Sequence, residues 1–138
     1  MSGTDREDIR EEILAWLRVA ESDQRVARLC LNADPPLRDA AAYHCQQAAE
    51  KLLKGFLVKA GSHVSKTHDL DARADLVRGH YPAIDDLLTP LPDWTTWSTA
   101  YRYPGEGGPQ PEPSVEELTR ALDFIGRLEA TLRSLAPP

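Results

Sequence analysis

The fold is decided by residues 41–57, which read Ala-Ala-Tyr-His-Cys-Gln-Gln-Ala-Ala-Glu-Lys-Leu-Leu-Lys-Gly-Phe-Leu. Mostly apolar residues recur there every three or four positions, the spacing of one face of an α-helix. This spacing predicts a helix over residues 35–60, with Asp34 as its N-cap, Pro35 as its first residue and Gly61 as its stop. The stripe consists of Ala41, Cys45, Ala48, Leu52, Phe56 and Lys59.

Helical spacing continues outward in both directions. Apolar residues predict long helices over residues 6–31 and 114–135, and a Ser-x-x-Glu capping box at residues 114–117 opens the second of them. Short helices are expected within residues 67–101, because prolines interrupt the helical pattern there. Residues 104–113 hold four prolines and three glycines, so we expect a flexible loop.

One domain is expected over residues 1–138, since this length is typical of a single domain. A long antiparallel helix pair would occupy residues 5–60. No window alternates apolar and polar residues in the manner of a strand. The predicted fold class is therefore all-α, an up-and-down helical bundle of three long helices plus two or three short ones.

Composition excludes several functional classes. Hydrophobic residues make up 41 % of the chain and charged residues 28 %, as in soluble globular proteins. No run approaches the roughly 18 apolar residues of a membrane span, and the first ten residues do not resemble a secretion signal, so we expect a cytoplasmic protein. A net charge of −6 argues against strong non-specific nucleic-acid binding. The two cysteines and four histidines lack metal-ligand spacing, so no metal and no cofactor is expected.

The lysines are confined to one segment, residues 51–68, which contains no acidic residue. His63 and His68 lie in the same segment. A positive segment on an acidic chain creates a local field that suits phosphate. The alternative is that these lysines are ordinary solvated surface residues. The segment contains Lys51, Lys54, Lys59 and Lys66.

Polar residues occupy a second face of the predicted helix 35–60. Gln47 and Glu50 lie on it, because residues three apart share a helix face. Three interpretations remain open for this face: a solvated surface with a Glu50–Lys54 ion pair, a groove, or a polar seam between two copies of the chain. The residues of this face are Tyr43, His44, Gln47, Glu50, Lys51 and Lys54.

Residues 41–57 resemble the signature helix of the HEPN domain, the "higher eukaryotes and prokaryotes nucleotide-binding" family. Two further motifs resemble the family in the same order: Lys-Thr-His-Asp-Leu at residues 66–70 and Tyr-Arg-Tyr-Pro at residues 101–104. The resemblance covers residues 6–135. It implies an up-and-down helical bundle that is commonly a homodimer and is often the partner of a small nucleotidyltransferase, in a toxin–antitoxin-like pair.

The resemblance also implies a site that binds nucleotide or RNA phosphate. Arg102 supplies a planar fork for phosphate, and the tyrosines beside it supply faces for a base. As alternatives, Arg102 bonds helix ends and His68 caps a helix. Trp94 and Trp97 fit the core or an interface better than a base-stacking platform. The proposed contacts are Lys51, Lys54, His68, Tyr101, Arg102 and Tyr103.

Some members of the family are metal-independent endoribonucleases that carry Arg, four to six residues, then His. Arg38 and His44 match this pattern, as do Arg73 and His80. Histidine can move the 2′-hydroxyl proton while arginine stabilises the phosphorane. However, about one match is expected by chance, and side chains six positions apart on one helix point about 120° apart. A non-catalytic binding protein is therefore the leading hypothesis. The alternatives are a nuclease that uses Arg38 and His44 or a composite site with Arg102, and a purely structural dimerisation module.

Overall fold

The computed structural model describes residues 3–62, 70–98 and 112–136 of the chain. These residues form helices and no strand, which confirms the all-α class. The elements are α1 (Gly3–Asn32), α2 (Arg38–Lys59), α3 (Leu70–His80), the 3₁₀ helix η1 (Pro82–Ile84), α4 (Asp85–Leu88), the 3₁₀ helix η2 (Leu91–Ser98) and α5 (Val115–Leu135).

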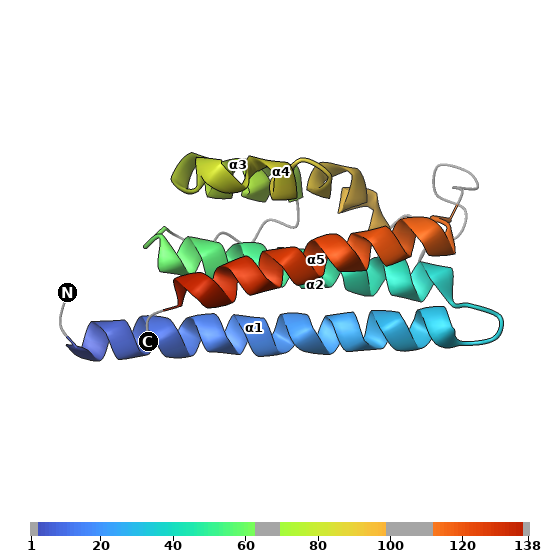
Figure 1. Cartoon of the computed structure of the whole chain (residues 1–138), viewed down its shortest axis with the longest axis horizontal. Helices are drawn as coiled ribbons and strands as arrows, with labels where there is room; N and C mark the ends of the chain where they lie inside the picture. The colour runs from blue at the N-terminus through green and yellow to red at the C-terminus, as the bar shows by residue number, and fades with distance from the viewer. Residues whose placement is uncertain (1–2, 63–69, 99–111, 137–138) are drawn as a thin grey trace.

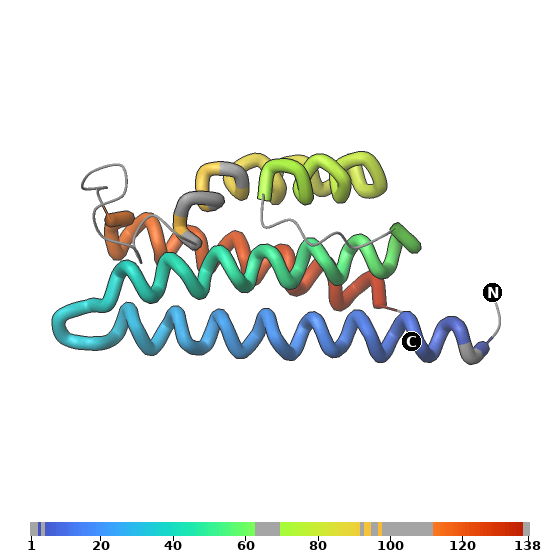
Figure 2. Tube along the Cα trace, turned by 180° about the vertical axis from the view of Figure 1, so that it is seen from behind, coloured from blue at the N-terminus to red at the C-terminus, as the bar shows by residue number. Residues whose placement is uncertain are grey.

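The helices stack in three layers (Figure 1). The long helix α1 forms the first layer, α2 and α5 lie side by side in the second, and the segment from α3 to η2 forms the third. Both α2 and α5 run opposite to α1, and the view from behind shows α3 to η2 carrying the chain back along the bundle between them (Figure 2). α1 therefore begins at the end of the bundle where α2 and α5 finish.

The middle helix α2 is covered on nearly all sides. Its consecutive residues Phe56, Leu57 and Val58 are all buried, although they point in different directions around the helix. Burial on every side is typical of a helix at the centre of a domain. Phe56 also contacts Tyr81 edge to face, with ring centroids 5.6 Å apart, and this joins α2 to the third layer.

The beginning of α2 differs from the sequence-based expectation. The helix begins at Arg38, not at Pro35, and its N-cap is Leu37, which makes no side-chain capping bond. The Leu37 N–H donates to the Cys30 carbonyl oxygen at 2.9 Å, a bond that closes the turn between α1 and α2 ahead of the helix. Asp34 is therefore part of the connection and does not cap α2.

The predicted capping box of α5 is confirmed. Ser114 Oγ accepts from the Glu117 N–H at 3.1 Å, and Glu117 reaches back to the Ser114 N–H. Between residues 82 and 98 the chain forms three short helices, η1, α4 and η2, within the segment where short helices are expected. No described helix is long and apolar enough to cross a membrane.

Candidate functional site

The polar face of α2 is partly enclosed within the chain, with Glu50 at its buried centre. Glu50 is fully buried, and its Oε1 lies 3.5 Å from Lys54 Nζ and 3.9 Å from Arg73 Nη2 on α3. Gln46 Nε2 donates to Glu50 Oε2 at 3.5 Å. A single chain therefore covers Glu50 itself, and this residue does not lie on an exposed face or an open seam.

The polar network continues from Gln46 toward the surface. Gln46 Oε1 accepts from Gln47 Nε2 at 2.6 Å, and Gln47 Oε1 accepts from Lys51 Nζ at 2.8 Å. Gln46, Gln47 and Lys51 are thus linked by successive side-chain hydrogen bonds, which provide the partners that buried polar groups need. The partner of Lys51 in this bond is a neutral amide, and no carboxylate among the described residues forms an ion pair with Lys51.

Lys54 is held more tightly than Lys51. Its side chain is only 16 % exposed, its ammonium pairs with Glu50, and it lies 4.9 Å from the centroid of the Trp16 ring. Burial lowers the pKa of Lys54 below its ordinary value, and the nearby Glu50 opposes that shift. A phosphate would have to displace the carboxylate of Glu50 to reach Lys54, so Lys51 is the more accessible cation of the two.

The two residues of the first nuclease match contact different parts of the chain. Arg38 Nη2 lies 3.2 Å from Glu112 Oε2, and Arg38 Nη1 donates to the Pro113 carbonyl oxygen at 3.5 Å. His44 Nδ1 lies 2.9 Å from Asp23 Oδ1 on α1. The structure therefore does not bring Arg38 and His44 together, in keeping with their separation around α2.

The two residues of the second nuclease match, Arg73 and His80, also lie in different environments. Arg73 is fully buried beside Glu50, whereas His80 is exposed at the last position of α3. Burial lowers the pKa of Arg73 below its ordinary value, and Glu50 counters this effect. The position of Arg73 indicates a role in packing α3 against α2.

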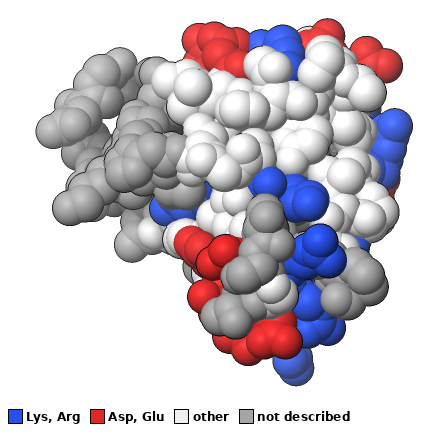
Figure 3. Space-filling view, turned by 90° about the vertical axis from the view of Figure 1, so that its left-hand side faces the viewer, with Lys and Arg blue, Asp and Glu red and all other residues white. Residues whose placement is uncertain are grey.

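Four residues of the predicted phosphate site lie outside the described residues, namely His68, Tyr101, Arg102 and Tyr103. The same holds for Lys66. Figure 3 views the end of the bundle where α1 begins, and there the described Lys and Arg side chains are interspersed with Asp and Glu around a broad uncharged area. No group of three or more metal-ligand side chains occurs among the described residues.

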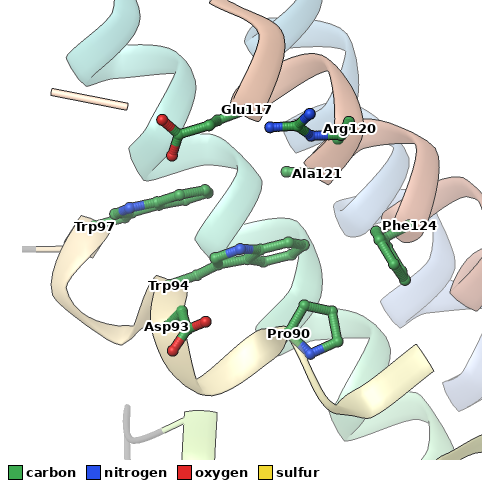
Figure 4. Close-up of a pocket in the computed structure, with 8 residues that line it drawn as sticks. All are labelled: Pro90, Asp93, Trp94, Trp97, Glu117, Arg120, Ala121 and Phe124. Carbon is green, nitrogen blue, oxygen red and sulfur yellow. The ribbon is translucent and has the colours of Figure 1, made fainter. Parts of the chain in front are cut away.

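A cavity of about 270 Å³ lies between η2 and the first half of α5. Figure 4 shows two tryptophans of η2 on one side of it and side chains of α5 on the other. The indole rings are stacked, with centroids 5.2 Å apart and planes 8° from parallel. The cavity is lined by Pro90, Asp93, Trp94, Trp97, Glu117, Arg120, Ala121 and Phe124.

The spacing of the two tryptophans explains their stacking. A 3₁₀ helix has three residues per turn, so side chains at positions i and i+3 lie directly above one another. Trp94 and Trp97 have this spacing on η2 and are each less than a tenth exposed. They pack with the core, as the sequence suggested, and they also form a wall of the cavity. Sequence reasoning did not identify this cavity. Two patterns could have indicated it: the Trp-x-x-Trp spacing at residues 94–97, and Glu117 and Arg120, which share a face of α5.

Comparison with known protein families identifies the chain. A family model described as the HEPN domain matches residues 13–135, which is most of the chain. No curated protein and no solved structure matches significantly.

Proposed function

The chain belongs to the HEPN family, and on this premise we propose that it binds nucleotide or RNA phosphate as the non-catalytic partner of a small nucleotidyltransferase. Membership supports a nucleotide- or RNA-related function in general. The proposal adds a toxin–antitoxin-like pairing and a homodimer. Phosphate would be bound by Lys51 with the motif residues His68 and Arg102.

The proposal that the protein is not a catalyst is supported by the different contacts of Arg38 and His44. Arg38 bonds Glu112 and Pro113 before α5, whereas His44 bonds Asp23 on α1. Metal-independent cleavage needs a proton-transfer group and a charge-stabilising group within reach of the same phosphate. Within one chain these two side chains are bonded to different neighbours, which supports the non-catalytic interpretation, and only a second copy could bring them to the same phosphate.

Lys51 supports the binding part of the proposal. Its ammonium is bonded to the amide of Gln47, and no carboxylate among the described residues pairs with it, so a phosphate would supply the opposite charge there. Lys54, in contrast, already pairs with Glu50. A positive group that meets phosphate weakens its binding as salt rises, because counterions compete.

Titration of ATP, GTP and a short RNA at low salt tests the proposal. Lys51→Glu should weaken binding by about tenfold, since it replaces attraction by repulsion. Arg25→Glu is the matched control, because it makes the same charge change at an exposed position on α1. Absence of binding to all three ligands would overturn the proposed function, and equal effects of the two substitutions would remove Lys51 from the site.

One observation favours an endoribonuclease as the second candidate function. The Asp23–His44 contact, at 2.9 Å, resembles the pairing by which a carboxylate orients a catalytic imidazole. His44 would then act as the base with an arginine other than Arg38. RNA cleavage in the presence of a chelator, lost in both His44→Ala and Asp23→Asn, would establish this alternative.

A further inference from the structure

We propose that the cavity between η2 and α5 binds a single purine base, with guanine preferred over adenine. This inference rests on the proposed function and deepens it, because it assigns the base to a place distinct from the phosphate-binding residues of α2. The base would belong to a free nucleotide or to an unpaired nucleotide of RNA, which share the same ring chemistry.

The aromatic wall is the first reason. Base–aromatic stacking contributes to nucleotide binding for any base, because each base has a π-face. Trp94 and Trp97 are 6 % and 7 % exposed, so packing already fixes their rings before a ligand arrives. Fixed side chains lose little conformational entropy on binding, which favours affinity.

The opposite wall leaves room for one flat ring. Ala121 lines the cavity from α5 next to Arg120 (Figure 4), and its methyl group takes up little space. The cavity measures about 270 Å³. Pockets for drug-sized ligands span roughly 300–1,000 Å³, so this one suits a base better than a whole cofactor.

The charged groups favour guanine. Three charged residues line the cavity, Asp93 from η2 and Glu117 and Arg120 from α5, and all three are exposed. The two on α5 stand opposite the indole rings (Figure 4). Arginine donates to O6 and N7 of guanine, the commonest specific contact to that base. A carboxylate accepts from the two donors on guanine's other edge, N1–H and N2–H₂. Adenine presents an acceptor at N1, which a carboxylate repels.

Glu117 has the freedom that this role requires. Its carboxylate lies 3.5 Å from the Ser114 N–H, a distance at the long limit of a hydrogen bond. The Glu117 carboxylate can therefore leave the Ser114 N–H and accept hydrogen bonds from a base instead. The shorter capping-box bond, from the Glu117 backbone N–H to Ser114 Oγ, stays in place.

Quenching of tryptophan fluorescence by GMP, AMP and ribose 5-phosphate tests the inference on the full chain. GMP should quench and bind more tightly than AMP, and ribose 5-phosphate should not quench. Glu117→Gln keeps a capping-box residue and Arg120→Lys keeps the charge, yet each should weaken GMP binding about tenfold or more. Arg133→Ala, at an exposed position later on α5, should leave GMP binding unchanged.

Two short RNAs that differ only in a central G or A extend the test to RNA. Tighter binding of the G-containing RNA, lost in Arg120→Lys, would support the inference with RNA as the source of the base.

If wild type binds GMP and both cavity variants bind it equally well, the base lies elsewhere and the inference fails while the proposed function stands. Equal binding of GMP and ribose 5-phosphate would also overturn the inference alone. If no nucleotide or RNA binds, the proposed function fails with it.

Discussion

Arg73 on α3 lies 3.9 Å from Glu50 on α2, measured from Nη2 to Oε1, and both side chains are only 1 % exposed. This buried ion pair joins the third layer of the bundle to its central helix. In the sequence, Glu50 belongs to the polar face of α2. In the structure it lies in the interior, where it links α2 to α3.

Arg73→Met should destabilise the protein strongly. Removal of one partner of a buried pair leaves the other charge poorly compensated, and such changes cost about 3–5 kcal/mol. Lys54 remains 3.5 Å from Glu50 and would soften the loss, so we expect the lower end of this range. Urea unfolding measures the effect.

Arg78→Met provides the comparison on the same helix. Arg78 pairs with Asp75 and Asp85 at the surface, where solvent weakens ion pairs. Its replacement should change the midpoint of unfolding much less than Arg73→Met does. Equal effects of the two substitutions would show that the buried pair is not a major support of α3.

Stability should fall at alkaline pH because of Cys45. Burial raises the pKa of this thiol from an ordinary value of 9.0 to about 12. Between these two values the unfolded state loses the proton and the folded state keeps it, so the free energy of unfolding decreases as pH rises from about 9. The largest slope from one group is about 1.4 kcal/mol per pH unit.

Unfolding in urea at pH 8, 9 and 10, with reductant present, checks this prediction. Cys45→Ala lacks the thiol, so its stability should depend less on pH over this range, although packing loss makes it less stable at every pH. Parallel pH curves for wild type and Cys45→Ala would show that another group causes the alkaline loss.

Gly55 and Gly126 should respond oppositely to alanine. A Cβ on Gly55 would lie 2.5 Å from Leu132 Cδ2, inside the buried contact between α2 and α5, whereas a Cβ on Gly126 would meet nothing within 4 Å. Alanine gains about 1 kcal/mol over glycine in a helix interior. Overpacking costs about 1–3 kcal/mol, so Gly55→Ala should lower the thermal midpoint and Gly126→Ala should raise it. A rise in both would mean that Leu132 adjusts without cost.

Much of the fold could be predicted from the sequence because local signals determine it. Helical spacing located all three long helices, and Ser114 with Glu117 marked the first turn of α5 correctly. The start of α2 could not be predicted, because it depends on a backbone bond from Leu37 to Cys30. No side-chain pattern encodes such a bond.

The candidate site was less predictable because it depends on contacts between helices distant in sequence. Nothing near Glu50 reveals that Arg73 covers it, so the polar face of α2 was open to several interpretations. Likewise, Trp94, Trp97 and Arg120 come to line one cavity only through the folding of η2 and α5 against α2. The predicted contacts of His68, Tyr101, Arg102 and Tyr103 remain predictions, since they lie outside the described residues.

The most direct test of the central claim combines binding and cleavage of one labelled RNA at low salt with a chelator present. The bound fraction is measured on a native gel, and the recovered RNA is then run on a denaturing gel. We predict that the RNA is bound, remains intact, and is bound less by Lys51→Glu than by Arg25→Glu. Absence of binding, or cleavage that His44→Ala abolishes, would contradict the account.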